Sequence, residues 1–230
     1  TEVTREFGIR FHTDAVQAPA WLALDYSKLG VCAMSVSAHK VGGPHGIGAL
    51  IISRDCHVTP LIHGGGQERD VRSGTLDTPA IVGFATALEI TTANKTETVI
   101  RVAALRDDLV KRVKEISPDA IYSGAITNRL VNNAHFVFPG CLGDSLLMLL
   151  DAQGVECSVG SACNAGVPQP SHVMLAMGAD EDQARSTLRF SLGWNSIQAD
   201  VDALITALPS AIERAKRAGV PKVTTAPVRV

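Results

Sequence analysis

A lysine that could react with a carbonyl group stands at Lys40, at the end of the run Ser37-Ala38-His39-Lys40. Small and β-branched residues at 31–36 predict a short strand before the run, and a glycine-rich turn follows at 41–46. A strand end keeps the backbone rigid while the loop leaves space for a ligand, and partial loss of water favours the uncharged, reactive form of an amine. These four residues alone are more readily explained as a surface loop, so the assignment needs further support.

A carboxylate that could pair with a ring nitrogen lies upstream, at Asp14 in the run His-Thr-Asp-Ala-Val-Gln. The apolar residues 9–12 predict a strand that leads into it. An aspartate beside a protonated pyridine nitrogen allows the ring to draw electrons from a bound substrate. Taken alone, Asp14 is more readily explained as a helix cap. Its combination with the lysine run favours the chemical interpretation.

A thiol that could act as a nucleophile stands at Cys163, within the small residues of 158–166 and shortly before Pro168 and Pro170. Such a segment has little to bury, so we expect it to be mobile and its thiol to be exposed. An exposed thiolate on a moving loop can attack a sulfur atom and deliver it elsewhere. A buried, inert cysteine fits this setting poorly.

The other cysteines and the histidines show no pattern of a disulfide or metal site. The five cysteines are odd in number and scattered, without a C-x-x-C pair, at Cys32, Cys56, Cys141, Cys157 and Cys163. We therefore expect no disulfide and no structural zinc, and expect four of the five thiols to be inert. Possible metal ligands crowd the first 63 residues without zinc spacing, at His12, Asp14, His39, His45 and His63. A metal site is not expected.

The composition is that of a soluble globular protein. The chain has 230 residues, of which 46% are hydrophobic and 19% charged, with a formal net charge of -2. The absence of a long basic run argues against nucleic acid as a partner. No stretch is apolar enough to span a membrane, and the first residues do not resemble a signal peptide. A cytoplasmic location is therefore expected.

The order of predicted elements indicates an α/β protein with a second, smaller α/β unit from about residue 95. A strand is predicted at 48–52 and a helix at 79–93, with Pro79 in its first turn. Asn94 and Glu97 have the spacing of a capping box that would start a separate helix ending near 117. Strands are then predicted at 134–138, 155–159 and 188–192, and helices at 143–151, 171–177, 197–208 and 212–218, the last two separated by Pro209.

Five blocks in this order resemble the cysteine desulfurases that serve iron–sulfur cluster assembly. They are His-x-Asp-Ala-x-Gln at 12–17, Ser-Ala-His-Lys-x-Gly-Gly-Pro at 37–44, the glycine-rich run with Arg-Ser-Gly-Thr at 64–75, Gly-Ser-Ala-Cys at 160–163 and Arg-Phe-Ser-Leu-Gly at 189–193. The resemblance implies the C-terminal part of a fold-type-I transferase that depends on pyridoxal 5'-phosphate. Residues 1–95 would complete the large, mainly parallel-sheet domain, 96–219 would form the small C-terminal domain with the cysteine loop, and 220–230 would be a flexible tail.

The resemblance also implies how the cofactor is held. Lys40 would bond covalently to pyridoxal 5'-phosphate and later move the Cα proton of the substrate. Asp14 would hold the pyridine nitrogen, and Gln17 the ring hydroxyl. Ser37 and His39 would bind the phosphate.

The implied reaction converts L-cysteine to L-alanine and leaves a persulfide on Cys163, for transfer to an iron–sulfur scaffold or another sulfur acceptor. Arg189 would bind the substrate carboxylate, because its planar guanidinium matches two oxygens. Thr75 would reach the phosphate in a neighbouring subunit, which implies a homodimer. Without the resemblance, Arg189 would be assigned to a structural ion pair and Thr75 to an ordinary cap.

Two alternatives remain open at this stage. Related fold-type-I enzymes include selenocysteine lyases and aminotransferase-like proteins, which the motifs alone do not separate. The family also carries upstream residues that this sequence does not show: a glycine and threonine loop for the phosphate, a ring that stacks on the cofactor, and an asparagine near the substrate. The alternative from another class is that the chain is a non-catalytic piece that complements or binds another chain.

Overall fold

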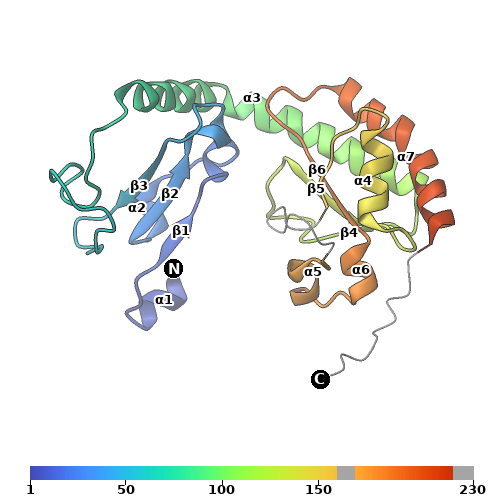
Figure 1. Cartoon of the computed structure of the whole chain (residues 1–230), viewed down its shortest axis with the longest axis horizontal. Helices are drawn as coiled ribbons and strands as arrows, with labels where there is room; N and C mark the ends of the chain where they lie inside the picture. Colours follow the sequence, from blue (N-terminus) through green and yellow to red (C-terminus); the bar gives the residue numbers. More distant parts are fainter. Residues whose placement is uncertain (160–168, 220–230) are drawn as a thin grey trace. The chain divides into compact units, whose positions relative to one another are not determined.

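The computed structural model describes residues 1–159 and 169–219 of the chain (Figure 1). Contacts divide the chain into two compact units, Thr1–Thr98 and Val99–Val230. Each unit contains its own three-stranded sheet. The expected α/β class is confirmed, with strands and helices in both units.

The first unit is built on a mixed sheet with the order β1-β2-β3. Strand β1 (His12–Asp14) pairs in parallel with β2 (Ala33–Ser37), and β2 pairs antiparallel with β3 (Gly48–Ile52). The short helices of this unit are α1 (Glu2–Glu6), η1 (Ala18–Ala20), α2 (Tyr26–Leu29) and η2 (Ala38–Val41). The strand expected at 48–52 is confirmed, whereas the first strand begins at His12 instead of residue 9.

The core of the first unit lies under this sheet and is made of small and medium apolar side chains, namely Ala15, Val31, Met34, Val36, Ala38, Val41 and Phe84. Phe84 comes from helix α3 (Thr78–Ile116), which is 39 residues long. Two side chains of α3 also bond to the backbone of this unit: Thr91 Oγ1 donates to the Val41 carbonyl at 3.1 Å and Lys95 Nζ to the Leu22 carbonyl at 2.9 Å. The N-terminal half of α3 therefore belongs to the first unit.

The helix break predicted at Asn94 is wrong. Helix α3 continues through this position, and Asn94 Nδ2 donates to the Ile90 carbonyl at 3.0 Å instead of its side chain capping a new helix. No glycine or proline stands at the junction to stop the helix. Both halves of α3 have buried residues, and their packing stabilises the continuous helix. The local capping pattern is overridden by this packing.

The second unit contains an antiparallel sheet with the order β4-β5-β6. Its strands are β4 (Ile121–Tyr122), β5 (Asn133–Val137) and β6 (Thr187–Ser191). Its helices are α4 (Gly143–Asp151), α5 (His172–Ala176), α6 (Glu181–Arg185) and α7 (Gln198–Ala218). The helix expected at 143–151 is confirmed, and the strands expected at 134–138 and 188–192 are confirmed with a shift of one residue. The strand expected at 155–159 is wrong, because only Ser158 pairs, as an isolated bridge with Arg189.

Helix α7 is also longer than predicted, because it passes through Pro209 without a break. Proline removes one helix hydrogen bond and crowds the preceding turn, at a cost of about 3 kcal/mol. The ring of Pro209 is exposed, whereas Leu204, Leu208 and Ile212 are buried on the other side of the same helix. Burial of this continuous apolar face offsets the cost, so the predicted division into two helices is corrected.

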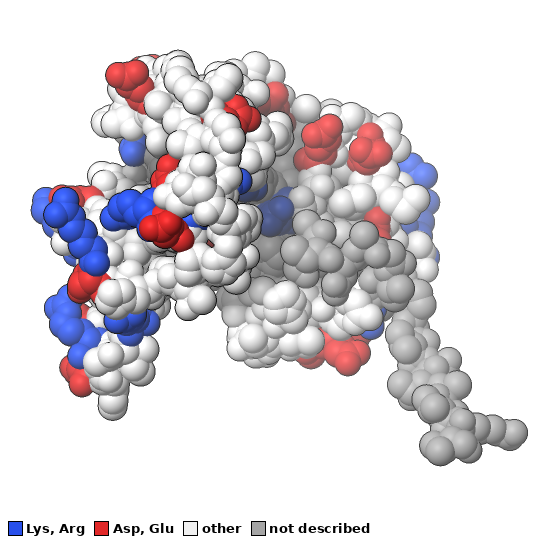
Figure 2. Space-filling view, turned by 60° about the vertical axis from the view of Figure 1, so that its left-hand side comes forward, with Lys and Arg blue, Asp and Glu red and all other residues white. Residues whose placement is uncertain are grey.

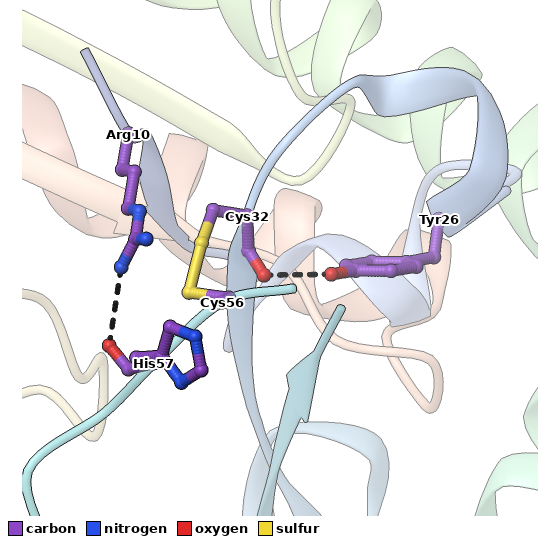
Figure 3. The surroundings of a disulfide bond; sticks show 5 residues. All are labelled: Arg10, Tyr26, Cys32, Cys56 and His57. Carbon is purple, nitrogen blue, oxygen red and sulfur yellow. Dashed lines mark hydrogen bonds between the residues drawn. A yellow bond between two sulfur atoms is a disulfide. The ribbon is translucent and has the colours of Figure 1, made fainter. Parts of the chain in front are cut away.

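The expectation of no disulfide is contradicted by a bond between Cys32 and Cys56 (Figure 3). The two cysteines are 24 residues apart in sequence, but the antiparallel register of β2 and β3 brings their surroundings together. Ala33 lies opposite Ile52, and the Ser53 N–H donates to the Cys32 carbonyl at 3.0 Å. The same carbonyl accepts from the Tyr26 hydroxyl at 2.8 Å. Sequence spacing could not reveal a pair that a sheet register creates.

No helix within the described ranges is both long and apolar enough to cross a membrane. On the face drawn in Figure 2, basic and acidic side chains lie interspersed among uncharged ones.

Candidate active site

The first group of candidate residues lies at the carboxyl-terminal edge shared by β1 and β2. Asp14 ends β1 opposite Ser35, and Ser37 ends β2. Because parallel strands present their carboxyl ends at one edge of the sheet, Asp14 and the segment after Ser37 are neighbours at that edge. The Ala15 N–H donates to the Ser35 carbonyl at 2.9 Å and extends the pairing by one step.

The Asp14 carboxylate is exposed and oriented by its own backbone. Its Oδ1 accepts from the Val16 N–H at 3.0 Å, as in a turn closed by an aspartate side chain. The second carboxylate oxygen accepts no hydrogen bond from residues 1–159 or 169–219, so it is open to another donor. Gln17 follows as the residue that precedes η1, and its side chain is exposed. Asp14 and Gln17 therefore stand on one short turn at the sheet edge.

The side chains of Ser37 and His39 contact each other. Ser37 Oγ and His39 Nδ1 are hydrogen bonded at 2.7 Å, and the His39 ring stacks on His45 with a centroid distance of 5.7 Å and an interplanar angle of 12°. His45 was considered in the sequence only as a possible metal ligand, and its contact with His39 was not anticipated. The bond and the stack orient a hydroxyl and an imidazole side by side, as a phosphate site requires.

Lys40 is exposed within η2, and Nζ forms no hydrogen bond or ion pair with the described part of the chain. The turn beneath it is tightly packed. Gly42 ends η2 with a φ of 79°, and a Cβ on Gly43 would approach Ala38 and Ala87 to 3.1 Å. The lysine therefore combines a free amine with a backbone that has little room to move.

Thr75 lies in the connection between β3 and α3, exposed and just before the helix. This connection is held by its own polar groups. The Gly74 N–H donates to Gln67 Oε1 at 2.9 Å, and the Gly66 N–H donates to Ser73 Oγ at 3.3 Å. Thr75 is therefore exposed on a loop that is held by its own hydrogen bonds. Its side chain does not cap α3, because the cap is Asp77, whose Oδ1 accepts from the Ala80 N–H at 3.0 Å.

Arg189 lies in the middle of β6 in the second unit. Its backbone exchanges two hydrogen bonds with Ser158, at 3.1 Å from the Ser158 N–H and 2.8 Å from the Arg189 N–H. Its Nε is buried and has no acceptor among the described residues. A structural ion pair, which was the alternative explanation, has no carboxylate partner within that part of the chain.

His135 was not singled out from the sequence. It lies on β5 directly opposite Arg189, and its buried Nδ1 also lacks a partner among the described residues. Burial lowers the pKa of His135, and the positive charges of Arg189 and then Arg129 lower it further. Only the strand register identifies this residue, because it belongs to none of the motifs.

The candidate thiol, Cys163, lies outside the described residues. Of the cysteines within them, Cys141 is fully buried, and burial raises the pKa of its thiol. Burial, followed by the nearby Asp151 carboxylate, raises the pKa of Cys157 to about 11. Both side chains are therefore thiols at neutral pH and poor nucleophiles. Across residues 1–159 and 169–219, no three His, Cys, Asp or Glu side chains gather as a metal site would require.

The first unit and its polar edge have the form of a fold-type-I enzyme that uses pyridoxal 5'-phosphate. The model of the aminotransferase class-V family matches residues 1–204, and the chain belongs to this family. Known proteins similar to it include cysteine desulfurases, which confirms the resemblance seen in the motifs.

Three comparisons define this similarity. The chain is 54% identical over 219 residues to the IscS-like cysteine desulfurase of Mycobacterium tuberculosis, which covers 95% of the chain and 56% of that protein. The structure of a NifS-like protein from Rickettsia africae has a TM-score of 0.84 at 32% identity, covering 92% of the chain and 56% of that structure. A structure described as SspA in complex with cysteine has a TM-score of 0.64 at 35% identity, covering 85% and 54%. The chain thus spans about half the length of the relatives it matches.

The residues of the first unit fit pyridoxal 5'-phosphate, the cofactor of this family. A free amine, a carboxylate with an open oxygen, and a hydroxyl bonded to an imidazole stand on the turns that follow two neighbouring parallel strands. These groups match an aldehyde, a pyridine nitrogen and a phosphate in chemical type. The donor set of the sheet edge is therefore complementary to the cofactor.

Proposed function

We propose that this chain carries the lysine, the cofactor-binding edge and the reactive cysteine of a cysteine desulfurase. The observation that carries the proposal is the grouping at one sheet edge of the Asp14 carboxylate, the Ser37–His39 pair and the free amine of Lys40. The close similarity to proteins named cysteine desulfurases supports L-cysteine as the substrate.

The cofactor, when bound, supplies an aldehyde for covalent attachment and a ring that accepts electrons from the substrate. Lys40 would hold the cofactor through its side-chain amine, and the same amine would carry the substrate Cα proton. Asp14 keeps the ring nitrogen protonated through its open carboxylate oxygen, and Gln17 donates to the ring hydroxyl. Ser37 and His39 bind the phosphate through the hydroxyl and imidazole that are already paired in the structure.

Substrate binding and sulfur transfer are assigned to the second unit. Arg189 binds the carboxylate of L-cysteine through the terminal nitrogens of its guanidinium, which has no carboxylate partner among the described residues. The Cys163 thiolate attacks the substrate sulfur. The carbon–sulfur bond breaks, the substrate carbon takes a proton, and the products are L-alanine and a persulfide on Cys163. A neighbour described as bound to cysteine supports this choice of substrate.

The wider setting follows from the same proposal. Residues 1–95 act as the end of the cofactor-binding domain, and 96–219 as the small domain. The protein acts in the cytoplasm as a homodimer in which Thr75 reaches the cofactor phosphate of the partner subunit. The persulfide passes to an iron–sulfur scaffold or another sulfur acceptor. The exposure of Thr75 on an organised loop supports its reach toward a second copy.

One observation favours a second candidate. Because the chain spans about half the length of its relatives, the 230 residues taken alone would act as a complementing or interaction piece if they lack cofactor. Selenocysteine as the substrate is the other alternative, and parallel assays with cysteine and selenocysteine distinguish it.

The proposal is tested with the whole gene product. Lys40→Ala is expected to lose the visible absorbance of the bound cofactor and all alanine formation, whereas Cys163→Ser keeps the absorbance and loses persulfide formation. Thr59→Ala, in an exposed loop position away from the sheet edge, serves as the control. Undiminished alanine formation by Lys40→Ala would refute the assignment of the amine, and undiminished persulfide formation by Cys163→Ser would refute that of the thiol.

A further inference from the structure

Two buried polar atoms without partners belong to residues that lie opposite each other on strands β5 and β6. They are Nδ1 of His135 and Nε of Arg189, and the two residues are directly opposite in the register. A buried polar atom without a hydrogen bond is costly, so two of them on facing residues require an explanation.

The backbone pattern places these side chains at the closest kind of cross-strand position. The Phe138 N–H donates to the Ser186 carbonyl at 2.7 Å and the Leu192 N–H to the Asn132 carbonyl at 2.8 Å, which marks the hydrogen-bonded positions of the pair. Alternation along the strands then makes His135 and Arg189 a non-hydrogen-bonded pair, whose side chains lie nearest. Their Cβ atoms are separated by about 5 Å in such pairs, which an arginine and a histidine can bridge.

The face of the sheet that carries this pair differs from the opposite face. Ala134, Phe136, Leu188 and Phe190 alternate with the pair and are all buried in the apolar core. On the side of His135 and Arg189, one neighbouring cross-strand pair is Asn133 and Ser191, of which Ser191 is exposed, and the other is Val137 and Thr187, which are both buried. The pair therefore stands between the buried and the exposed end of this face, and a substrate can approach it from the exposed end.

The two atoms are also complementary in chemistry. Arginine Nε–H is always a donor, whereas histidine Nδ1 accepts only when the ring is neutral. The charged groups that act on the His135 ring are Arg189 from β6 and Arg129 from the loop before β5. Together with burial they lower the pKa of His135, so the ring is neutral at physiological pH and available as an acceptor.

We propose that His135 is a positioning residue for Arg189: when the substrate carboxylate binds, the two side chains turn toward each other, His135 Nδ1 accepts a hydrogen bond from Arg189 Nε, and the two terminal nitrogens of the guanidinium are directed to the carboxylate. The structure itself does not contain this bond, since both atoms lack a partner in it. The inference rests on the proposed function, in which Arg189 binds the carboxylate of L-cysteine. His135 itself touches neither the substrate nor the cofactor. Its effect is to reduce the orientations of the guanidinium in the bound state.

The test measures KM and kcat for L-cysteine in the whole gene product with four variants. His135→Leu removes the acceptor and is expected to raise KM about tenfold or more with a smaller change in kcat, because a hydrogen bond to a charged group is lost from substrate binding. His135→Gln supplies an amide oxygen as the acceptor and is expected to keep KM near the wild-type value. Ser191→Ala is the matched control on the same face, and Arg189→Lys checks the carboxylate site itself.

A pH profile gives a readout that a merely structural role would not change. Protonation of His135 removes the acceptor and adds a positive charge beside Arg189, so wild-type KM is expected to rise as the pH falls below the ordinary histidine range of about 6.5. The ratio of the His135→Gln KM to the wild-type KM should fall over the same range, because glutamine does not titrate. This comparison also stands if His135→Leu does not fold.

The outcomes separate the inference from the function on which it rests. If Arg189→Lys leaves KM unchanged, the carboxylate site is wrongly assigned and the proposed function loses its substrate residue. If Arg189→Lys raises KM but folded His135→Leu does not, the positioning role of His135 is overturned while the function stands. Parallel pH profiles for the wild type and His135→Gln would also overturn it.

Discussion

Reduction of the disulfide between Cys32 and Cys56 should destabilise the first unit by a measurable amount. The bond closes a loop with a sequence separation of 24 residues. Loop-closure entropy for a loop of that length corresponds to a stabilisation of about 3.5 kcal/mol at 25 °C, through restriction of the unfolded chain. Cys56 lines an open surface pocket with His57 and Arg69, so a small phosphine reductant has access to the bond.

The two tryptophans allow the first unit to be followed alone. Trp21 lies in the first unit and is 8% exposed, whereas Trp194 lies in the second and is 68% exposed. In a Trp194→Phe background, urea unfolding followed by fluorescence therefore reports on the surroundings of Trp21. With an m-value of about 1–3 kcal/mol/M, the predicted loss lowers the urea midpoint by roughly 1–3.5 M on reduction.

The control is the double variant Cys32→Ser with Cys56→Ser, which should unfold near the midpoint of the reduced protein and show no response to reductant. A midpoint that reductant leaves unchanged in the Trp194→Phe protein, with mass spectrometry showing the two thiols free, would refute the loop-closure argument. Persistence of the free thiols before any reductant is added would instead refute the bond itself.

Two further predictions concern the second unit. Burial and Asp151 raise the pKa of Cys157 to about 11, so alkylation of Cys157 at pH 8 should be much slower than that of Cys163 and should accelerate as the pH rises toward 11. Mass spectrometry of the labelled peptides measures both rates. Equal labelling rates at pH 8 would contradict the burial of Cys157. Phe136→Ala should destabilise the second unit by about 3–5 kcal/mol in urea unfolding, because the ring is 0% exposed, whereas Ile126→Ala, at a side chain 86% exposed, should change it by less than about 0.5 kcal/mol. A small effect of Phe136→Ala would show that the core closes over the missing ring.

Much of the local structure could be predicted from the sequence where one signal dominates. The run 48–52 contains Leu50, Ile51 and Ile52 after a glycine-rich turn, and the helix at 143–151 contains five consecutive apolar residues after Gly143, Asp144 and Ser145. Predictions failed where packing at a distance overrides a local signal. Asn94 has the residue type of a cap, yet it lies within α3, which has buried residues on both sides of it. Pro209 has the residue type of a helix breaker, yet it lies within α7, which has buried residues before and after it.

The residues of the candidate site also differ in whether the sequence alone reveals them. Asp14, Ser37, His39 and Lys40 could be found because each belongs to a compact motif at a strand end, and the structure places them at one edge. His135 could not be found, because its relation to Arg189 exists only in the register of two strands distant in sequence. The pairing of Cys32 with Cys56 has the same origin, since no rule of spacing reveals contacts made by antiparallel strands.

The hydrogen bonds between Arg189 and Ser158 have a practical consequence for mutagenesis. Both bonds are made by backbone atoms, so any residue except proline at position 189 retains them. Substitution of Arg189 therefore removes the positive charge and the N–H donors of the guanidinium, while β6 stays paired with Ser158. Variants at position 189 therefore test the proposed substrate contact of this side chain without loss of the backbone pairing with Ser158.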